Sequence, residues 1–210
     1  MRFYFYQTPG LLKWVYKPCT WRKVTDRKVL YLTFDDGPVP IATPFVLDTL
    51  KAYRAKATFF VVGDNVRKHP EIFQSVISQG HSIGNHTYNH LKGWNTVDEQ
   101  YFANVEQCQQ TIEKYGYFRE QPIMRPPYGR IKPAQLRSLS EKYEIVMWQI
   151  LSGDFDLALN HRSAWSTLSK ANNGDIIVFH DSQKYLPNVQ QLLPKMLSHF
   201  SEKGYVFESL

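Results

Sequence analysis

The sequence predicts an α/β fold whose parallel strands form either an open doubly wound sheet or a (β/α) barrel. Short apolar runs rich in β-branched and aromatic residues alternate along the chain with stretches of helical spacing. Strands that alternate with helices pair in parallel, because each helix returns the chain to the start of the next strand. No linker, low-complexity tract or internal repeat interrupts this alternation.

The expected strands and helices follow one another in regular order. The expected strands are 29–34, 57–62, 81–84, 122–124, 144–151, 175–179 and 205–208. The expected helices are 40–53, 66–79, 97–115, 133–142, 161–171 and 187–203. Glycines at positions 80, 116 and 204 stand near the ends of three of these helices, where glycine commonly ends a helix.

The composition fits one globular domain. The chain has 210 residues, of which 43% are hydrophobic and 21% are charged. Aromatic residues make up 15%, a surplus that suits a groove for flat ligands such as sugar rings. The net charge of +6 favours anionic surroundings as a general bias. No Lys/Arg cluster or nucleic-acid motif occurs, so we expect no nucleic-acid partner.

The N-terminus is not expected to act as a signal peptide or as a transmembrane segment. Pro9 and Lys13 interrupt its apolar residues, and no small-residue cleavage site follows. No run approaches the ~18 apolar residues that span a bilayer, so we expect a cytoplasmic location by default. The aromatic residues within 1–27 leave a peripheral membrane contact open.

Polar clusters follow the expected ends of five strands. They are Asp35-Asp36, Asn85-His86, Arg125, Ser152-Gly153-Asp154 and His180. Parallel α/β folds build their sites at the carboxyl ends of strands, in barrels and open sheets alike. The separations along the chain are too long for one local motif, so the fold itself must bring these residues together.

The adjacent carboxylates of Asp35 and Asp36 predict a division of roles. They end the first expected strand, within the stretch TFDDGP at 33–38. Neighbouring side chains of a strand point to opposite sides, so one carboxylate can bind a metal while the other handles a proton. Taken alone, the same stretch is equally well explained as an acidic turn.

His86 and His90 are four residues apart in HTYNH at 86–90. On a helical turn they would lie on one face, close enough to share one cation. A carboxylate from a distant strand end would complete a set of two imidazoles and one carboxylate, the open donor set of catalytic zinc sites. Such an ion lowers the pKa of its water and polarises a substrate carbonyl.

Hydrolysis at such a site also needs groups that move protons and stabilise charge. The aspartate that does not bind the metal is a candidate base, and His180 is a candidate acid. Arg125 can pair with a carboxylate, and an anion at Asp154 would raise the pKa of His180. Each residue alone also has a structural explanation, as a surface ion pair, a turn residue or a helix-entry residue.

Together these motifs resemble those of polysaccharide deacetylases, the NodB homology domains of carbohydrate esterase family 4. They are TFDDGP at 33–38, HTYNH at 86–90, RPPYG at 125–129, SGD ending at Asp154, and FHD at 179–181. The resemblance covers about residues 28–209 and implies a distorted (β/α) barrel of about seven parallel strands. It divides the chain into an N-terminal extension at 1–27, packed on the barrel, and one catalytic domain at 28–210.

The resemblance also implies an activity and a cofactor. Members of this family hold a divalent metal, usually Zn²⁺, with Co²⁺, Ni²⁺ or Mn²⁺ as other candidates. They remove N- or O-acetyl groups from sugars such as N-acetylglucosamine in peptidoglycan or chitin, or from acetylated xylan. An acetylated carbohydrate is therefore the expected partner, and the sugar, the acetyl position and the oligomeric state stay open.

Carried over position by position, the resemblance assigns the ligands, the catalytic groups and the groove. The metal ligands are Asp36, His86 and His90. The catalytic groups are Asp35 as base, His180 as acid, Arg125 to orient the base, Asp154 to tune the acid, and Tyr128 to meet the oxyanion with its backbone N–H. The substrate groove is assigned to Pro127, Tyr128, Phe155 and Val178. Trp94, just after the two histidines, is a separate candidate that could stack on a sugar face, and packing in the core explains it equally well.

Two motifs depart from the family pattern. In the fourth motif, Leu151 and Phe155 stand where the family usually has an aspartate and a tryptophan. Asp154 remains, so we expect the tuning of the acid to survive while the wall of the groove changes. Val178 replaces a leucine of the last motif, which is a conservative change in the expected acetyl pocket.

Two other functions remain as alternatives to a sugar deacetylase. One is a non-catalytic carbohydrate-binding module that retains the metal. The presence of both Asp35 and His180 argues against it, because neither residue is needed to hold zinc. The other is an amidase that acts on a small non-sugar amide. Metal-dependent turnover of acetylated sugars and of small amides separates these functions.

Overall fold

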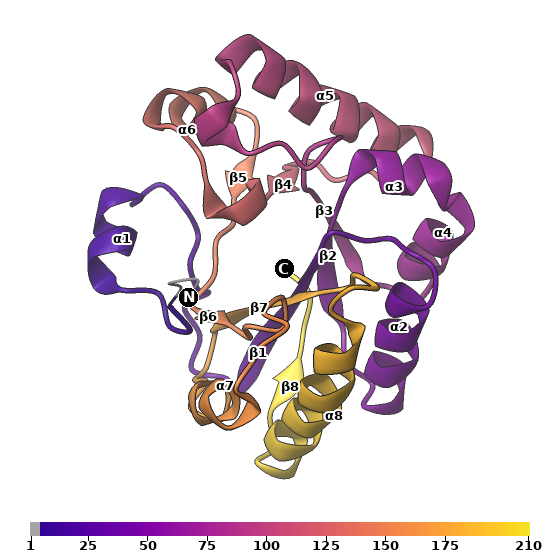
Figure 1. The fold of residues 1–210 in the computed structure, drawn as a ribbon, viewed down its shortest axis with the longest axis vertical. Coiled ribbons are helices and arrows are strands. Elements are labelled where there is room, and N and C mark those ends of the chain that lie inside the picture. The colour runs from indigo at the N-terminus through magenta and orange to yellow at the C-terminus, as the bar shows by residue number, and fades with distance from the viewer. Residues whose placement is uncertain (1–4) are drawn as a thin grey trace.

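A curled sheet of parallel strands forms the centre of the molecule (Figure 1). The computed structural model describes residues 5–210. Its strands are β1 (Val29–Asp35), β2 (Ala57–Val61), β3 (Ser82–Asn85), β4 (Ile123–Met124), β5 (Glu144–Ile145), β6 (Ile150–Leu151), β7 (Ile176–His180) and β8 (Val206–Phe207). Neighbouring strands follow the order β5-β4-β3-β2-β1-β7-β6, and β8 pairs with β1 beside this path. All pairings are parallel, and the strands of the path form a half-barrel, which confirms the predicted fold class.

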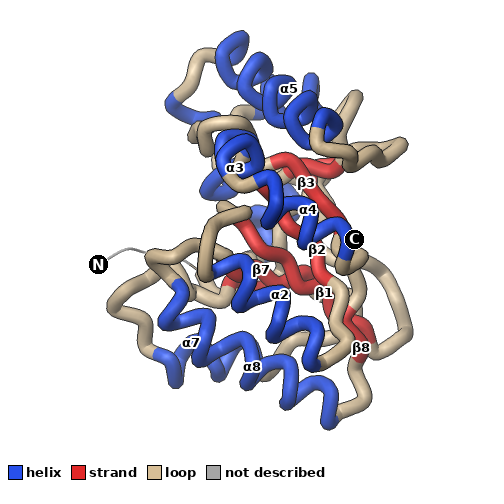
Figure 2. Tube along the Cα trace, turned by 90° about the vertical axis from the view of Figure 1, so that its right-hand side faces the viewer, coloured by secondary structure: helices blue, strands red, loops and turns tan. Residues whose placement is uncertain are grey.

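Most of the helices cover the outer face of the half-barrel. They are α1 (Gly10–Val15), α2 (Ala42–Ala52), α3 (Gly63–Lys68), α4 (Pro70–Ser78), α5 (Asp98–Lys114), α6 (Pro133–Leu139), α7 (His161–Leu168) and α8 (Leu186–Glu202), with short 3₁₀ turns η1 (Gly93–Asn95) and η2 (Pro127–Gly129). Figure 2 shows α2 and α4 over strands β1 and β2. The largest cluster of buried apolar side chains lies between these helices and the sheet.

The alternation of side chains along β1 separates the core from the polar groups. Phe34 points outward and stacks on Phe59 of β2 and Phe179 of β7, with ring centroids 5.1 and 5.9 Å away. Thr33 and Asp35 flank Phe34 in the strand and therefore point to the inner face. One strand thus contributes apolar packing on one side and polar chemistry on the other.

The run at 144–151 is not the continuous strand that the sequence predicted. It forms β5 and β6, which lie at opposite ends of the strand path, because β5 pairs with β4 and β6 pairs with β7. Residues 146–149 cross the gap between the two ends of the strand path, which we call the seam. The prediction was wrong because an unbroken apolar run does not reveal that its two halves pair with different strands.

The helix predicted at 66–79 is two helices, α3 and α4. His69 ends α3 with a φ of −131°, and Pro70 begins α4. Proline has no N–H to donate, and its ring disfavours the helical conformation of the preceding residue. The helix therefore stops before Pro70. The other expected elements are present with ends that differ by a few residues, whereas α1 was not predicted.

The segment ahead of β1 lies across the seam of the half-barrel. The Thr8 N–H donates to the carbonyl oxygen of Gln149 at 3.0 Å, and the Thr20 N–H donates to that of Ile145 at 2.8 Å. These bonds give backbone partners to the open edges next to β5 and β6. Helix α1 spans the distance between the two contacts. The division of the chain at residue 28 stays a prediction.

Replacing Gly174 with Ala is expected to disrupt the packing of this segment. Gly174 has a φ of +80°, and a Cβ there would lie 1.8 Å from the carbonyl oxygen of Lys23. Gly116→Ala is the matched control, because Gly116 has a φ of +91° but no atom within 4 Å of the added Cβ. Both variants carry the roughly 1 kcal/mol cost of a left-handed alanine. Urea unfolding should show the larger loss for Gly174→Ala, and equal losses would contradict this close approach.

Candidate active site

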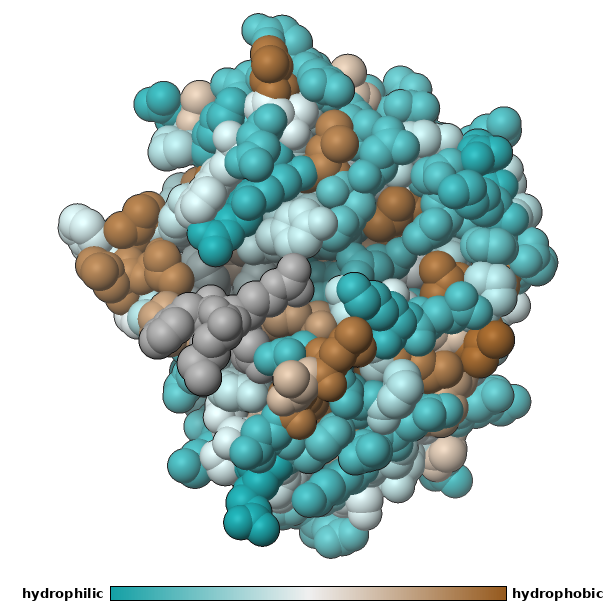
Figure 3. All heavy atoms as spheres, in the orientation of Figure 1, coloured by the Kyte–Doolittle hydropathy of each residue, from teal (hydrophilic) through white to brown (hydrophobic). Residues whose placement is uncertain are grey.

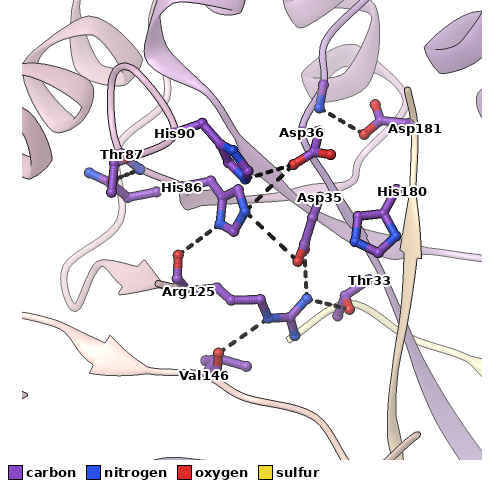
Figure 4. Close-up of polar contacts among 12 residues, drawn as sticks. Thr33, Asp35, Asp36, His86, Thr87, His90, Arg125, Val146, His180 and Asp181 are labelled. Atoms are coloured by element: carbon purple, nitrogen blue, oxygen red, sulfur yellow. Dashed lines mark hydrogen bonds and ion pairs between the residues drawn. The ribbon is translucent and has the colours of Figure 1, made fainter. Parts of the chain in front are cut away.

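The carboxyl ends of several strands gather polar residues at one end of the half-barrel (Figure 4). Asp35 ends β1 and is the register partner of His180, which ends β7. His86 follows β3, and Arg125 follows β4. Residues that the sequence placed at separate strand ends are therefore neighbours in the fold.

Asp36, His86 and His90 form a cluster of metal-type donors. Nε2 of His90 lies 3.1 Å from Oδ1 of Asp36, and Nε2 of His86 lies 3.7 Å from the same oxygen. The three donor atoms all lie within 4.8 Å of one another, close enough to share one ion. One carboxylate and two imidazoles are the donors of an open zinc-type site. The chemistry of this cluster therefore fits a divalent cation.

The protonation states of the cluster suit metal ligation. Nδ1 of His86 lies 2.7 Å from the carbonyl oxygen of Arg125, which can only accept, so Nδ1 carries the proton and Nε2 is free. Burial lowers the pKa of His86 to about 4 and keeps the ring neutral. Burial raises the pKa of Asp36, but the hydrogen bond from His90 and the charge of His180 outweigh burial and hold that pKa below its ordinary value.

A loop, and not the helical turn that the sequence predicted, brings His86 and His90 together. Thr87 and His90 have left-handed backbone angles, with φ of 63° and 56°. The side-chain oxygen of Asn104 on α5 accepts from the Tyr88 N–H at 2.8 Å and holds the loop against that helix. A spacing of four residues did not distinguish the two conformations, because either one can bring both imidazoles to one ion.

Backbone strain is concentrated in these motifs. Within residues 5–210, six non-glycine residues have positive φ, and four of them are Asp36, Thr87, His90 and Tyr128. Such conformations cost about 1–3 kcal/mol each and persist only where the surroundings enforce them. The tertiary structure therefore holds the donor cluster and the Tyr128 loop in conformations that the local sequence does not favour.

A buried ion pair holds Asp35. Nη1 of Arg125 donates to Oδ1 of Asp35 at 2.7 Å and to the Thr33 hydroxyl at 2.7 Å. Nε and Nη2 of Arg125 donate to the carbonyl oxygens of Val146 and Met147 at 3.2 and 2.9 Å. Arg125 is completely buried, so it is not the surface ion pair of the alternative explanation. It links β1 to the chain that crosses the seam.

Asp154 holds His180 by two hydrogen bonds. Nδ1 of His180 donates to Oδ1 of Asp154 at 2.7 Å, and the His180 N–H donates to Oδ2 at 2.7 Å. Asp154 is completely buried, and Asn188 of α8 donates to its carbonyl oxygen at 2.8 Å. Burial lowers the pKa of His180, but the charge of Asp154 and this hydrogen bond raise it to about 10. His180 is therefore a cation at neutral pH.

Two of the predicted groove residues contact the histidines of the site. The ring of Tyr128 is exposed and lies 4.7 Å from the ring of His90, centroid to centroid. The ring of Phe155 meets that of His180 edge-on at 5.5 Å. Both aromatic side chains therefore stand beside the polar centre, and their contact with a sugar stays a prediction.

The other predicted groove residues lie farther from the polar centre or beneath its surface. Pro127 is buried, and Val178 is buried on the same face of β7 as the strand-end histidine. Trp94 is exposed and donates from Nε1 to the carbonyl oxygen of Ile131 at 3.0 Å. The guanidinium of Arg130 stacks on the Trp94 ring at 4.2 Å. Trp94 is thus a surface residue beside the RPPYG loop and not part of the core.

Asp181 is a site residue that the sequence reasoning missed. Its Oδ1 accepts from the Gly37 N–H at 2.9 Å, and its Oδ2 accepts from the Thr43 hydroxyl at 2.6 Å. Figure 4 shows the Asp181 carboxylate beside Asp36. A Cβ at Gly37 would lie 1.9 Å from Oδ2, so this contact requires glycine. Burial raises the pKa of Asp181 to about 8 against these hydrogen bonds. The sequence signal for Asp181 is its position in FHD, directly after the strand-end histidine.

Known proteins match this chain over most of its length. The family profile described as Polysaccharide deacetylase matches residues 22–148. A peptidoglycan-N-acetylglucosamine deacetylase of Bacillus cereus is 35% identical over 90% of this chain and 89% of that protein. The peptidoglycan-N-acetylmuramic acid deacetylase PdaC of Bacillus subtilis is 31% identical over 86% of this chain and 37% of that protein. The crystal structure of the Bc1960 peptidoglycan N-acetylglucosamine deacetylase superposes with a TM-score of 0.86 at 29% identity, and covers 97% of this chain and 95% of that chain.

The half-barrel of parallel strands and the polar centre at its carboxyl end define the class of α/β deacetylases. The chain belongs to the polysaccharide deacetylase family. The Bacillus cereus and Bacillus subtilis relatives are named for the deacetylation of different amino sugars of peptidoglycan, N-acetylglucosamine and N-acetylmuramic acid.

Replacing Arg125 with Met is expected to lower the free energy of unfolding by about 3–5 kcal/mol, because Asp35 is left buried without its charge partner. Arg130→Met is the matched control, since Arg130 is exposed in the same loop. Urea unfolding of both variants measures the difference. A loss no larger for Arg125→Met than for Arg130→Met would contradict the structural role of the buried guanidinium.

Proposed function

We propose that this chain is a metal-dependent hydrolase that removes the N-acetyl group from an amino sugar of peptidoglycan or a related glycan. The observation that carries the proposal is the position of two proton-transfer candidates beside the donor cluster. Oδ2 of Asp35 lies 4.0 Å from Nε2 of His86, and Asp35 pairs in register with His180. The activities of the two named relatives support the substrate class, with N-acetylglucosamine as the first sugar to test. An O-acetyl group would leave by the same steps.

Asp36, His86 and His90 would hold the metal. Two imidazoles and a carboxylate suit Zn²⁺ first, and Co²⁺, Ni²⁺ or Mn²⁺ accept the same donors. When bound, such an ion polarises the acetyl carbonyl and lowers the pKa of water. The remaining steps of the proposal rest on side chains and backbone groups of this chain.

Asp35 would take the proton from the attacking water. Its Oδ1 is held by Arg125, so Oδ2 is the oxygen nearer the donor cluster. The water oxygen forms a bond to the acetyl carbon, and the carbonyl electron pair moves onto the carbonyl oxygen. A backbone N–H of Tyr128, the exposed residue with a left-handed φ of 61°, would donate to that oxyanion.

His180 would give its Nε2 proton to the departing nitrogen as the C–N bond breaks. The products are then acetate and a free amino sugar. Asp154 keeps His180 charged and oriented, because it occupies both the backbone N–H and Nδ1 and leaves only Nε2 for the substrate. Pro127, Phe155, Val178 and Trp94 would shape the groove around the acetyl group and the sugar.

A non-catalytic carbohydrate-binding role explains less of this geometry. It does not require an anion and a cation that are each held by a buried partner beside the donor cluster. Hydrolysis of a small amide would use the same residues, so only substrates can separate it from sugar deacetylation.

Asp35→Asn is expected to lower acetate release ~10²-fold or more while metal binding persists, because the base is lost but the three donors remain. The measurement is acetate released from N-acetylglucosamine oligomers, peptidoglycan, acetylxylan and small amides, on chelated protein with and without added Zn²⁺. Bound zinc is measured on the same samples by elemental analysis.

Two variants serve as controls for this experiment. His86→Ala should lose both bound zinc and activity, and full zinc occupancy in that variant would refute the proposed donor set. Asp48→Asn removes an exposed carboxylate of α2 and should change neither quantity. Unchanged turnover in Asp35→Asn would remove Asp35 from the role of base.

Asp154→Asn is expected to move the alkaline limb of the pH–rate profile to lower pH. The charge of Asp154 raises the pKa of His180 to about 10 against burial, so its removal lets burial lower that pKa. The stability that this pair contributes has the same sign. The stabilisation of the folded state by this pair is fully present below pH 6.5, the ordinary pKa of histidine, and is lost as pH rises through about 10, the pKa of His180 in the fold. Reaction rates and urea unfolding are measured across the alkaline pH range, with Asp48→Asn as control. An alkaline limb that does not move in Asp154→Asn would contradict the role of Asp154 in raising the pKa of His180.

A further inference from the structure

The positive charge of the chain is concentrated at its N-terminus. Residues 1–28 contain seven of the 25 Lys and Arg residues but one of the 19 Asp and Glu residues, a surplus equal to the whole net charge of +6. The remaining 18 basic and 18 acidic residues cancel. The net charge is therefore not spread over the chain as a general bias, because its surplus falls within residues 1–28 of the sequence.

The same segment exposes a group of large apolar side chains, which we call the α1 patch. Its members are Phe5, Leu11, Leu12, Trp14 and Val15. Helix α1 has no buried residue, and Leu11 and Trp14 are 72% and 75% exposed. Figure 3 shows brown, hydrophobic residues over α1 at the left edge of the molecule. Apolar patches of this kind commonly mark a surface that another body covers.

Two lysines border the α1 patch. Lys13 donates from Nζ to the amide oxygen of Gln149 at 3.0 Å. Burial raises the pKa of Asp175, and the charge of Lys13 acts against that rise. Lys17 follows α1 directly and is exposed. Farther along the segment, Arg22, Lys23 and Arg27 instead pair with acidic residues of the barrel. Lys13 and Lys17, which lie next to the exposed apolar side chains, form no such ion pair within residues 5–210.

Contacts with the barrel hold the chain in place before and after α1. Before α1, the Thr8 hydroxyl donates to the carbonyl oxygen of Trp148 at 2.7 Å. After α1, the Tyr16 hydroxyl lies 3.5 Å from the carbonyl oxygen of Ile131, which follows the RPPYG loop. The α1 patch is thus fixed to the body of the molecule beside the loop that carries Tyr128.

We propose that the α1 patch and its flanking lysines dock on the surface of a lipid bilayer that carries anionic headgroups. Exposed Leu, Val, Phe and Trp side chains beside Lys are typical of segments that lie in a membrane interface. Their apolar parts enter the headgroup boundary, and the lysines extend toward the anionic phosphates. Within residues 5–210, no helix has the length and apolarity to cross a membrane.

Docking in this position has a consequence for the site. The loop of Tyr128 would lie close to the bilayer, so the proposed deacetylase would meet glycan near the membrane surface. The docking itself is independent of the chemistry. It stands on the exposed side chains and the charge of the N-terminal segment.

Sedimentation of the full chain with vesicles tests the docking. We expect binding to phosphatidylcholine vesicles that contain phosphatidylglycerol, weaker binding to phosphatidylcholine alone, and loss of binding as salt is raised. The double variant Leu11→Ser with Trp14→Ser should bind the anionic vesicles at least ~10-fold more weakly, because it removes the two most exposed apolar side chains of the patch. Lys17→Gln should weaken binding to anionic vesicles only.

A matched double variant controls for exposed apolar residues in general. Phe118→Ser with Leu157→Ser removes side chains that are similarly exposed, 74% and 68%, but lie outside the α1 patch. This control should bind vesicles as the unmodified chain does. Acetate release from a soluble N-acetylglucosamine oligomer should be equal in all variants, which shows that they are folded.

Several outcomes would overturn the docking. They are no binding of the unmodified chain to anionic vesicles, or equal losses in the patch and control variants. If the unmodified chain binds purified peptidoglycan but not vesicles, and the patch variant loses that binding, the patch binds a polymer. If light scattering instead shows self-association that the patch variant abolishes, the patch binds a second copy of the chain. Vesicle binding without deacetylase activity would leave the docking intact and refute the proposed function alone.

Discussion

The buried guanidinium of Arg125 is the interaction on which the rest of the structure depends. It donates to Asp35 and Thr33 on β1 and to two carbonyl groups of the chain that crosses the seam. The guanidinium carbon of Arg125 lies 4.1 Å from the centroid of the aromatic ring of Phe60. A buried charge is stable only when its donors are satisfied and an anion is near. The course of the seam and the orientation of Asp35 are therefore set by one constraint.

A second buried ion pair, between His180 and Asp154, completes the polar centre of the site. Asp35 is an anion held by a buried cation, whereas His180 is a cation held by the buried anion of Asp154. Asp181 joins the two strand ends, because it follows His180 and accepts from the turn at Gly37. Asp35 and His180 thus each have a buried partner of their own, which fixes the orientation of the charged side chain.

Three features that were not predicted from the sequence share a physical cause. The apolar run at 144–151 indicates burial, but burial on a sheet does not determine which strands are the partners. The spacing of His86 and His90 indicates a shared ligand, but a strained loop held by Asn104 produces the same proximity as a helix. Asp181 had no recognisable partner, because its contacts to Gly37 and Thr43 cross more than a hundred residues of chain. These three failures concern contacts between distant residues, whereas the break of the helix predicted at 66–79 follows from Pro70 itself.

The sequence by itself determined the alternation of strands and helices, the chemical types at the strand ends, and the family to which they belong. These properties are local, because the period of apolar side chains and the residues of each motif can be identified from short stretches of sequence. Only the tertiary structure decided the tautomer of His86, the charge of His180, the strained loop and the contacts of the N-terminal segment across the seam. Those properties depend on burial and on groups brought together from distant parts of the chain. Electrostatic energies and backbone strain respond to such neighbours and not to sequence position.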